Sequence, residues 1–348
     1  MILPLTEEVR NSALIKGLIT HHELVLDNST FITLDSCNAQ GIMGAILKKM
    51  PTNNSIHLDF GSCVHSALEE KFRGGGVVDQ ITAAKNDPSW DAIPDGNHFA
   101  KTQEKVIEII QAYHVHTEVT PDFDLLSFKG EPLVEQSFRL PLGNIKLSMA
   151  SPYLRELFGF DMHETDEFVT IQVYWQGKID LFTRYNNENW ITDHKTTSIM
   201  GAKFADTFVR SSQMVGYLWA GMELIRHGFD KLTLPNGKVV DLSAQPYRGV
   251  LINAIAIRKS VLEFKVFPIP IPYTRLDEWR DGTLLRLRYF VEQLSEFMVT
   301  GLVAPTREHC VTKYGRCPFF DVCEAPMHMR GKMLNSQLFN TSTWSPLD

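Results

Sequence analysis

The chain lacks the features that would place it in a membrane, outside the cell or among repeat proteins. No hydrophobic run in its 348 residues approaches the roughly 20 residues that a membrane helix needs. The first residues hold no basic stretch followed by an apolar one, so we expect no secretory signal, no membrane association and a cytoplasmic location. In that compartment cysteines are more often metal ligands or core residues than disulfide partners. Internal repeats, low-complexity tracts and long linkers are missing too, which predicts a single domain over residues 1–348.

What is present is the composition of an ordinary globular protein. Hydrophobic residues make up 44% of the chain and charged residues 22%, which fits a folded domain with a sizeable core. The formal net charge of -7 argues at first against a polyanionic partner. The charge is uneven, however, because residues 258–332 hold 12 Lys and Arg against 9 Asp and Glu. Net charge therefore does not decide what the protein binds.

The periodicity of apolar residues predicts an α/β or α+β fold with a mixed sheet. A helical period is present at residues 36–49, 60–72, 99–116, 202–226 and 275–300. A period of two predicts strands at residues 131–140, 168–175, 178–185, 190–195, 249–257 and 262–267. Residues 186–189 read as a hairpin turn, and the Gly- and Pro-containing stretch 74–98 as an exposed connection. We expect a helical part over about 1–120, a sheet core over about 130–270, and a C-terminal helix with a cysteine-rich tail over about 275–330.

Two aspartates and a lysine form the first candidate site. Side chains alternate along a strand, so Asp193 and Lys195 point to one face while His194 points to the other and leaves its backbone carbonyl at the strand. The preceding strand of the hairpin can bring Asp180 beside Asp193. Two converging carboxylates repel each other unless a divalent cation lies between them, and oxygen ligands favour Mg²⁺ or Mn²⁺. Lys195 would then orient a metal-bound water and offset negative charge.

Each of these residues also has an ordinary structural interpretation. An Asp-X-Lys string is common in surface hairpins, where it forms a simple ion pair. His65 could be a hydrogen-bonded helix histidine. Gln213 and Tyr217 share a helix face, where the tyrosine could simply pack in the core. Glu135 could add a carboxylate from a neighbouring strand, although a solvated glutamate would look the same in sequence.

Four cysteines far apart in the chain form the second candidate site. Cys37 lies near the N-terminus, and Cys310, Cys317 and Cys323 lie near the C-terminus. Thiolates bind soft or borderline metals, which makes zinc and iron–sulfur clusters the physical candidates. Four-cysteine zinc sites usually contain close Cys-X₂₋₄-Cys pairs, and this sequence has none at these positions. An iron–sulfur cluster, a zinc ion and unrelated buried cysteines all remain open, while Cys63 reads as a small core residue.

The ordered set of motifs resembles the PD-(D/E)XK nuclease superfamily in its RecB-like branch. That branch combines a helical His, a Gly-X-X-Asp strand, an Asp-X-Lys strand and a Gln-X-X-X-Tyr helix, and all four occur here in that order between Cys37 and Cys323. The resemblance implies a restriction-endonuclease-like mixed sheet flanked by helices. It also implies Mg²⁺ or Mn²⁺ as the cofactor, with metal ligands at His65, Asp180, Asp193 and the His194 carbonyl. Lys195 would be the catalytic lysine, and the other catalytic or supporting residues would be Gln213 and Tyr217.

The cysteine pattern resembles the iron–sulfur clasp of AddB-type and CRISPR-associated RecB-like exonucleases. The resemblance implies a structural [4Fe–4S] cluster that joins the N-terminal helix to the C-terminal tail, with ligands Cys37, Cys310, Cys317 and Cys323. A cluster of this kind would stabilise only the folded state that presents all four thiolates.

The function implied by both resemblances is that of a metal-dependent deoxyribonuclease, an exonuclease acting on DNA ends or single strands. We expect no base-specific readout, because no sequence-reading module is present. A phosphate-binding Gly-X₄-Gly-Lys-Ser/Thr loop is absent as well, so a helicase or annealing protein would be a separate partner. By analogy the setting would be phage or bacterial recombination or repair. The alternatives are a catalytically silent nuclease fold that docks DNA or protein, and a zinc-stabilised structural protein.

Overall fold

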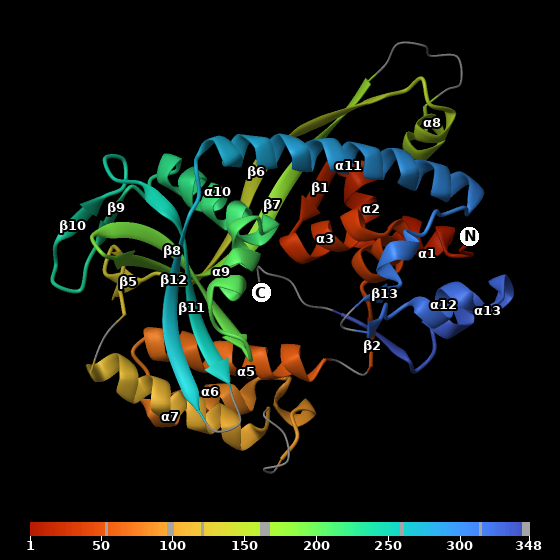
Figure 1. The fold of residues 1–348 in the computed structure, drawn as a ribbon. Helices are drawn as coiled ribbons and strands as arrows, with labels where there is room; N and C mark the ends of the chain where they lie inside the picture. Colours follow the sequence, from red (N-terminus) through yellow and green to blue (C-terminus); the bar gives the residue numbers. More distant parts are fainter. Residues whose placement is uncertain are drawn as a thin grey trace. The chain divides into compact units, whose positions relative to one another are not determined.

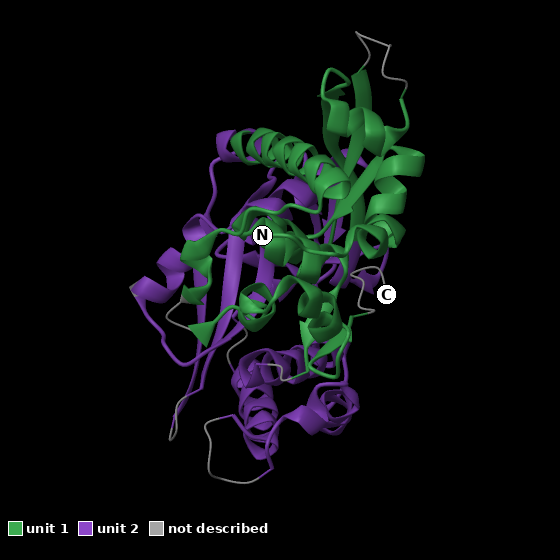
Figure 2. Cartoon of the chain, turned by 90° about the vertical axis from the view of Figure 1, so that its right-hand side faces the viewer, with its two compact units in different colours: residues 1–53, 138–177, 278–348 green, residues 54–137, 178–277 purple. Residues whose placement is uncertain are grey.

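Two units, each assembled from separate stretches of the chain, make up the fold of the computed structural model (Figure 2). The structure describes residues 1–52, 55–95, 101–119, 122–160, 168–257, 261–312 and 315–342. Unit 1 contains residues 1–53, 138–177 and 278–348, and unit 2 contains residues 54–137 and 178–277. Strand β7 (Phe168–Tyr185) contributes to both units, because residues up to Gly177 belong to unit 1 and residues from Lys178 onward belong to unit 2.

The sheet of unit 2 is mixed and is centred on β8 (Glu188–Thr197). This strand pairs antiparallel with the second half of β7 and parallel with β11 (Tyr247–Ile257), which pairs antiparallel with β12 (Leu262–Pro270). The turn between β7 and β8 has left-handed φ angles of 49° at Asn186 and 63° at Asn187, a conformation that asparagine tolerates. The predicted hairpin is confirmed, although the two strands predicted at 168–175 and 178–185 are one continuous strand.

Helices contact the central strands β8 and β11 of unit 2, which explains why β11 is buried along almost its whole length. All but one residue of β11 are buried. Two of its isoleucines pack into a core with the three helices α5 (Ile56–Phe72), α6 (Val77–Asn86) and α7 (Gln103–Val119), which lie together in Figure 1. The helices that follow β8 are α9 (Ala202–Val209), which contacts β12, and α10 (Ser212–Arg226), which contacts β8 and β11.

Two predictions for this unit are wrong, an exposed connection at residues 74–98 and a single helix at 202–226. Residues 74–98 were expected to form an exposed connection, yet they contain α6, in which the Gly76 amide is capped by the Asp79 carboxylate. Val77, Ile81 and Ala84 recur at helical spacing and pack into the core, which outweighs the turn-forming glycines before them. The single helix expected at 202–226 is two helices, because the chain leaves helical geometry between Val209 and Ser212.

Short elements complete unit 2 beside the main sheet. A small antiparallel sheet has the strand order β10-β9-β4-β5, and β3 pairs antiparallel with β7. Their bounds are β3 Asp124–Leu125, β4 Ser127–Phe128, β5 Glu131–Pro132, β9 Lys231–Thr233 and β10 Val239–Asp241, and a 3₁₀ turn spans Trp90–Ala92.

Unit 1 combines the N-terminal helices with the long C-terminal helix. Strand β1 (Glu23–Leu26) pairs parallel with the first half of β7. Trp175 on β7 is almost fully buried, with ring contacts to Phe31 and Trp279. The remaining bounds are α1 Thr6–Asn11, α2 Ala13–Lys16, α3 Asn28–Ser36, α4 Asn38–Gln40, β2 Lys49–Pro51, β6 Val134–Ser148, α8 Pro152–Phe158, α11 Thr274–Thr300, β13 Val311–Thr312, β14 Gly315–Arg316, α12 Phe320–Glu324, α13 Met327–Leu334 and β15 Phe339–Thr341, with π-helical turns at Gly17–His21 and Gly41–Ile46 and a 3₁₀ turn at Arg307–His309.

The N-terminal part of unit 1 differs from the prediction at Cys37. A short helix was expected at 36–49, but Cys37 is an extended residue between α3 and α4, and the helix that follows ends in the π-helical turn Gly41–Ile46. The α/β class with a mixed sheet and flanking helices is confirmed. Among the described helices, none is both long enough and apolar enough to span a membrane.

Candidate active site

The β7–β8 hairpin of unit 2 brings Asp180 and Asp193 to the same place in the sheet. Leu181 pairs with Thr192 in the antiparallel register, so the residues just beyond this pair are Asp180 and Asp193. Both side chains are buried, with exposed fractions of 7% and 1%. Asp180 Oδ2 accepts a hydrogen bond of 2.7 Å from the backbone amide of His194, which fixes its carboxylate against the neighbouring strand. Two buried carboxylates in one place form a strong attractor for a cation.

Lys195 follows Asp193 on the same face of β8 and forms an ion pair with it. Its Nζ lies 2.6 Å from Asp193 Oδ2. Burial raises the pKa of Asp193, and the nearby Asp180 adds to this effect against the opposing pull of Lys195. Burial alone would lower the pKa of Lys195, but Asp193 and Asp180 outweigh it and the pKa is raised. Lys195 is therefore a protonated counter-ion held beside the two aspartates.

His65 reaches the same place from helix α5. Ser55 caps this helix by accepting a hydrogen bond from the amide of His57, and the helix places the His65 ring against β8. His65 Nε2 lies 2.9 Å from the His194 carbonyl oxygen, and Nδ1 lies 3.6 Å from Asp180 Oδ2. The imidazole, the Asp180 carboxylate and the His194 carbonyl thus lie together, as a shared cation would require.

Glu135 also joins this group. Three ligand atoms lie within 4.8 Å of one another, one each from His65, Glu135 and Asp180. Burial, followed by the charges of Asp180 and Glu69, raises the pKa of Glu135 to about 8. The sequence offered only a weak signal for this residue, a glutamate in the middle of the strand predicted at 131–140.

Helix α10 supplies the polar pair predicted from the Gln-X-X-X-Tyr spacing. Gln213 Nε2 donates a hydrogen bond of 3.0 Å to Tyr217 Oη. Burial, then the charges of Asp193 and Asp180, raise the pKa of Tyr217 well above its usual value. The phenol therefore adjoins the two aspartates on the face of the sheet that α10 covers.

The His194 side chain lies on the opposite face of β8 from Asp193 and Lys195, with its ring centroid 5.8 Å from that of His65, and it takes part in a hydrogen-bond network that the sequence did not reveal. Asn253 Nδ2 donates to Tyr113 Oη at 2.6 Å and lies 2.9 Å from His194 Nδ1. The ring stacks on Phe72, and burial lowers the pKa of His194 to about 3, so the imidazole is neutral. The available signal was Asn253, an asparagine inside the mostly apolar strand β11, because a buried amide needs a partner.

The four cysteines of the second candidate site lie in unit 1 and come close together. Burial, then the neighbouring thiols of Cys317, Cys37 and Cys310, raise the pKa of Cys323 to about 12. The amide of Cys317 donates to the Cys310 carbonyl at 2.8 Å across the β13–β14 hairpin, and the amide of Thr306 donates to Cys37 Sγ at 3.3 Å. All four residues are described, and no three of their thiols lie within 4.8 Å of one another. The fifth cysteine, Cys63, is fully buried in the core of unit 2, as expected.

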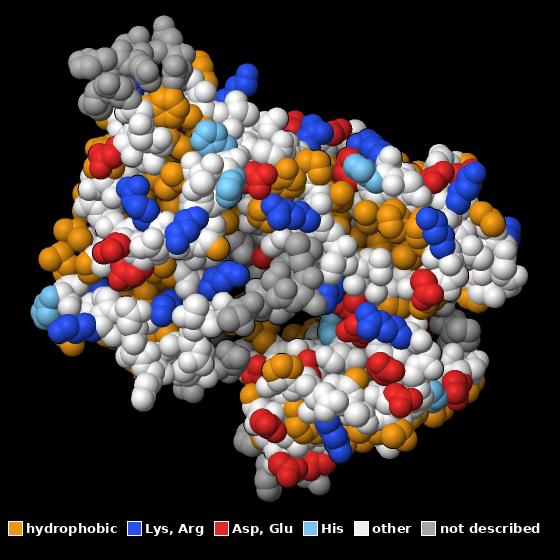
Figure 3. Space-filling view, turned by 180° about the vertical axis from the view of Figure 1, so that it is seen from behind, with side chains coloured by type: hydrophobic (Ala, Val, Ile, Leu, Met, Phe, Trp, Pro, Cys, Tyr) orange, Lys and Arg blue, Asp and Glu red, His pale blue; other side chains and the backbone are white. Residues whose placement is uncertain are grey.

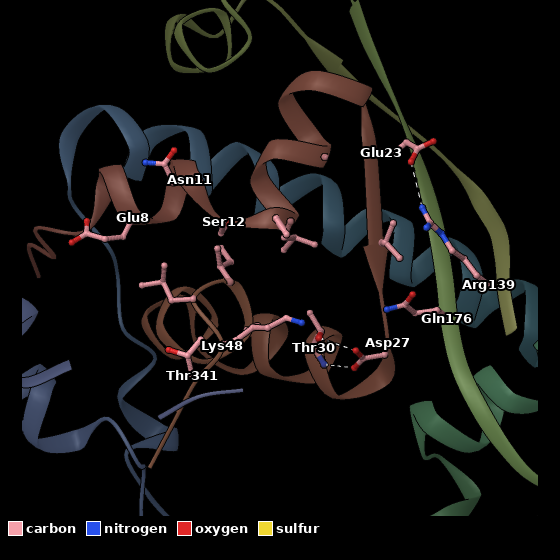
Figure 4. A pocket seen from close by; sticks show the side chains of 17 residues that line it. Glu8, Asn11, Ser12, Glu23, Asp27, Thr30, Lys48, Arg139, Gln176 and Thr341 are labelled. Carbon is pink, nitrogen blue, oxygen red and sulfur yellow. Dashed lines mark hydrogen bonds and ion pairs between the residues drawn. The ribbon is translucent and has the colours of Figure 1, made fainter. Parts of the chain in front are cut away.

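A cavity of about 550 Å³ in unit 1 is separate from both candidate sites (Figure 4). Three of its charged wall residues, Glu23, Asp27 and Arg139, already have partners within the wall. Arg139 Nη2 lies 3.4 Å from Glu23 Oε2, and Asp27 caps helix α3 by accepting a hydrogen bond from the Thr30 amide. We therefore assign no ligand to this cavity.

Comparison with known proteins agrees with the geometry of the site. A family model described as the PD-(D/E)XK nuclease superfamily matches residues 29–324 of the 348-residue chain. The matched range contains every residue of the carboxylate–lysine site and all four clustered cysteines. No curated protein matches the chain with significant similarity.

Proposed function

The chain belongs to the PD-(D/E)XK nuclease superfamily, whose members are metal-dependent nucleases, and from this premise we propose that it is a deoxyribonuclease of the RecB-like branch that degrades DNA from its ends. The observation that carries the proposal is the convergence of a helical histidine, two strand aspartates and a strand lysine on one place in unit 2. A hairpin that merely carried a surface ion pair would not bury both aspartates or direct a histidine at them.

The residues at this site fit a Mg²⁺ or Mn²⁺ ion. The donor set is mostly oxygen, and the buried Asp180 and Asp193 carry more negative charge than Lys195 alone offsets. The ligands would be His65, Asp180, Asp193 and the His194 carbonyl. When bound, the ion supplies Lewis-acid polarisation of the phosphate and lowers the pKa of a coordinated water.

The chain's own groups would then do the positioning. Lys195, beside Asp193, would orient the attacking water and offset charge that develops on the phosphoryl oxygens. The Gln213–Tyr217 pair would hold the aspartate side of the site or contact the DNA strand. Phosphodiester hydrolysis of this type leaves a 5′-phosphate and a 3′-hydroxyl.

We also propose that Cys37, Cys310, Cys317 and Cys323 hold a structural [4Fe–4S] cluster. Three thiolates on one zinc ion, at a Zn–S distance of about 2.3 Å, would lie about 3.8 Å apart. No three of these described thiols fall within 4.8 Å of one another, although the neighbouring thiols, after burial, contribute to raising the pKa values of Cys317 and Cys323. Four-cysteine zinc sites usually contain close Cys-X₂₋₄-Cys pairs, which this sequence lacks at these positions, and this favours iron–sulfur over zinc.

An end-directed substrate agrees with the charge distribution on one face of the described part of the chain. On the face that Figure 3 shows, basic and acidic side chains of the described residues are interspersed and do not gather into one broad basic field. Binding along a long duplex without base readout depends on many phosphate contacts, whereas an end can be held by the active site and a few nearby cations. A cytoplasmic setting in phage or bacterial recombination or repair, with a separate helicase or annealing protein, is part of the same proposal.

The proposal is tested by a time course on single- and double-stranded DNA labelled at the 5′ or the 3′ end, with Mg²⁺ or Mn²⁺. We expect short products to appear first from one labelled end, and cleavage to stop when the metal is chelated. Asp193→Asn is the control for contaminating nucleases, because it keeps the shape of the side chain and removes its charge. Equal cleavage by this variant would refute the site assignment. Cleavage of a closed circular single strand at the same rate would refute the end requirement.

A further inference from the structure

Glu135 lies where three separate elements of unit 2 meet. It is the second residue of β6, and its carboxylate approaches ligand atoms of His65 from α5 and Asp180 from β7. The three ligand atoms lie within 4.8 Å of one another, and no other set of three His, Cys, Asp or Glu side chains among the described residues meets that limit. The spacing is that of groups able to share one ion.

The backbone of Glu135 adopts a conformation that a strand residue does not need for pairing. Its φ angle is 51°, in the left-handed region that residues with a Cβ rarely occupy. Unusual backbone geometry of this kind persists where the surrounding structure holds a side chain in a particular place. Here that place is beside Asp180.

The cations near Glu135 do not fully offset the negative charges that surround its carboxylate. Asp180 and Glu69 both act on it as like charges, and two cations oppose them: Lys178, whose Nζ is 4.0 Å from Glu135 Oε2, and Arg73, which itself pairs with Glu69 at 2.7 Å. Asp193 differs, because Lys195 pairs with it at 2.6 Å. Of the carboxylates near His65, Glu135 is thus less closely paired than Asp193 and is better able to accept a cation.

We propose that Glu135 is a direct ligand of the divalent ion, binding it together with His65 and Asp180. This inference rests on the proposed function, because the ion is the one that would support DNA cleavage. A third anionic ligand would raise the affinity for Mg²⁺ or Mn²⁺, since affinity at oxygen sites depends on the number of charged ligands. The competing role is structural, in which Glu135 serves only as the ion-pair partner of Lys178.

The test measures Mn²⁺ binding to the full chain without DNA, by following the loss of the free-ion signal in electron paramagnetic resonance. Glu135→Gln keeps the size of the side chain and removes its charge. Glu131→Gln is the matched control, because Glu131 is an exposed glutamate of the adjoining strand β5. We expect Glu135→Gln to weaken Mn²⁺ binding by about tenfold or more, and Glu131→Gln to leave it unchanged.

Two further variants separate the possible failures. If Lys178→Met weakened Mn²⁺ binding as much as Glu135→Gln, the ion-pair role would explain the data and the inference would be overturned; we expect binding within about twofold of the unmodified chain, because Lys178 is not a ligand. If Asp180→Asn lost the ion while Glu135→Gln kept it, the inference would be wrong and the metal site would stand. If the unmodified chain bound no Mn²⁺ at all, the proposed function itself would fail.

Thermal unfolding without metal checks that Glu135→Gln folds. Removing a carboxylate that faces Asp180 and Glu69 relieves repulsion, so the melting temperature of the metal-free variant should equal or exceed that of the unmodified chain. A lower melting temperature with unchanged Mn²⁺ affinity would show that Glu135 acts only in the structure.

Discussion

At the scale of single residues, the site depends on charges that are buried before any cation arrives. Asp193 is 1% exposed and relies on Lys195, while Asp180 relies on the His194 amide. A buried carboxylate that loses its only cationic partner becomes an uncompensated charge. The catalytic lysine of the proposed mechanism is therefore also a structural residue in the metal-free protein.

Replacing Lys195 by Met should affect both stability and activity. Without metal we expect the free energy of unfolding to fall by about 3 kcal/mol, because Asp193 is left buried and unpaired. The double variant Lys195→Met with Asp193→Asn should recover most of that loss while cleavage stays at least about 100-fold reduced. Urea denaturation and the end-label time course measure the two effects. A double variant as unstable as the single one would show that the ion pair is not the cause.

The buried network behind His194 gives a second prediction at this scale. Replacing Asn253 by Leu removes the partner of both the Tyr113 hydroxyl and His194 Nδ1, so we expect a loss of about 2–3 kcal/mol in urea denaturation. Replacing Tyr113 by Phe removes only one hydroxyl and should cost about 1 kcal/mol. If both substitutions cost the same, Asn253 would not be holding His194.

The residues of the motifs could be predicted from sequence, but their partners could not. Asp180, Asp193 and Lys195 were predictable because a two-residue period and a hairpin turn fix their faces. Asn253 and Tyr113 pair with His194 only because of the parallel register of β8 with β11 and the docking of α7. Register across non-adjacent strands leaves no local pattern in the sequence.

At the scale of elements, the placement of β11 next to β12 depends on a residue without a side chain. A Cβ at Gly249 would lie 2.1 Å from the backbone oxygen of Ile269, and a backbone atom cannot move aside without breaking the pairing. The β8–β11 register also shifts between Tyr247 and Gly249, which marks a local irregularity in the strand. The glycine thus permits the close approach that closes this side of the sheet.

Replacing Gly249 by Ala should therefore destabilise the fold by about 2–3 kcal/mol, as an overpacked core position does. Gly282 in α11 is the matched control, since a Cβ there meets no atom within 4 Å. Gly282→Ala should stabilise the protein by about 0.5–1 kcal/mol, because alanine favours a helix. Urea denaturation of both variants checks the contrast, and equal effects would contradict it.

Element prediction from sequence succeeded where periodicity was long and failed where a short element is stabilised by tertiary packing. The buried face of α7, formed by Val106, Ile109, Ile110 and Tyr113, was predictable from its spacing alone. Helix α6 was not, because its neighbouring glycines and aspartates are typical of loops. Its apolar residues stabilise the helix because they pack into the core that α5 and α7 provide.

At the scale of the whole molecule, each unit draws together segments that are remote in sequence. Unit 1 is built from three segments and unit 2 from two, a division that composition along the chain does not reveal. In unit 1 the N-terminal residues are held to the residues after α11, since the amide of Leu3 donates to the Gly301 carbonyl and Ile2 bridges to Leu302. Cys37 and the three C-terminal cysteines belong to the same unit.

A cluster held by Cys37, Cys310, Cys317 and Cys323 would add a second connection between these ends. Loss of the cluster should therefore lower the stability of the protein. Protein purified without oxygen should be brown and contain about four iron atoms per chain. Cys317→Ala should lose the colour and the iron and should unfold at lower urea concentration, because the cluster stabilises only the state that presents all four thiolates. Cys63→Ala is the control, since Cys63 lies in the core of unit 2 and should leave the iron content unchanged. Colourless protein with one zinc ion per chain would overturn the iron–sulfur assignment and leave the nuclease site unaffected.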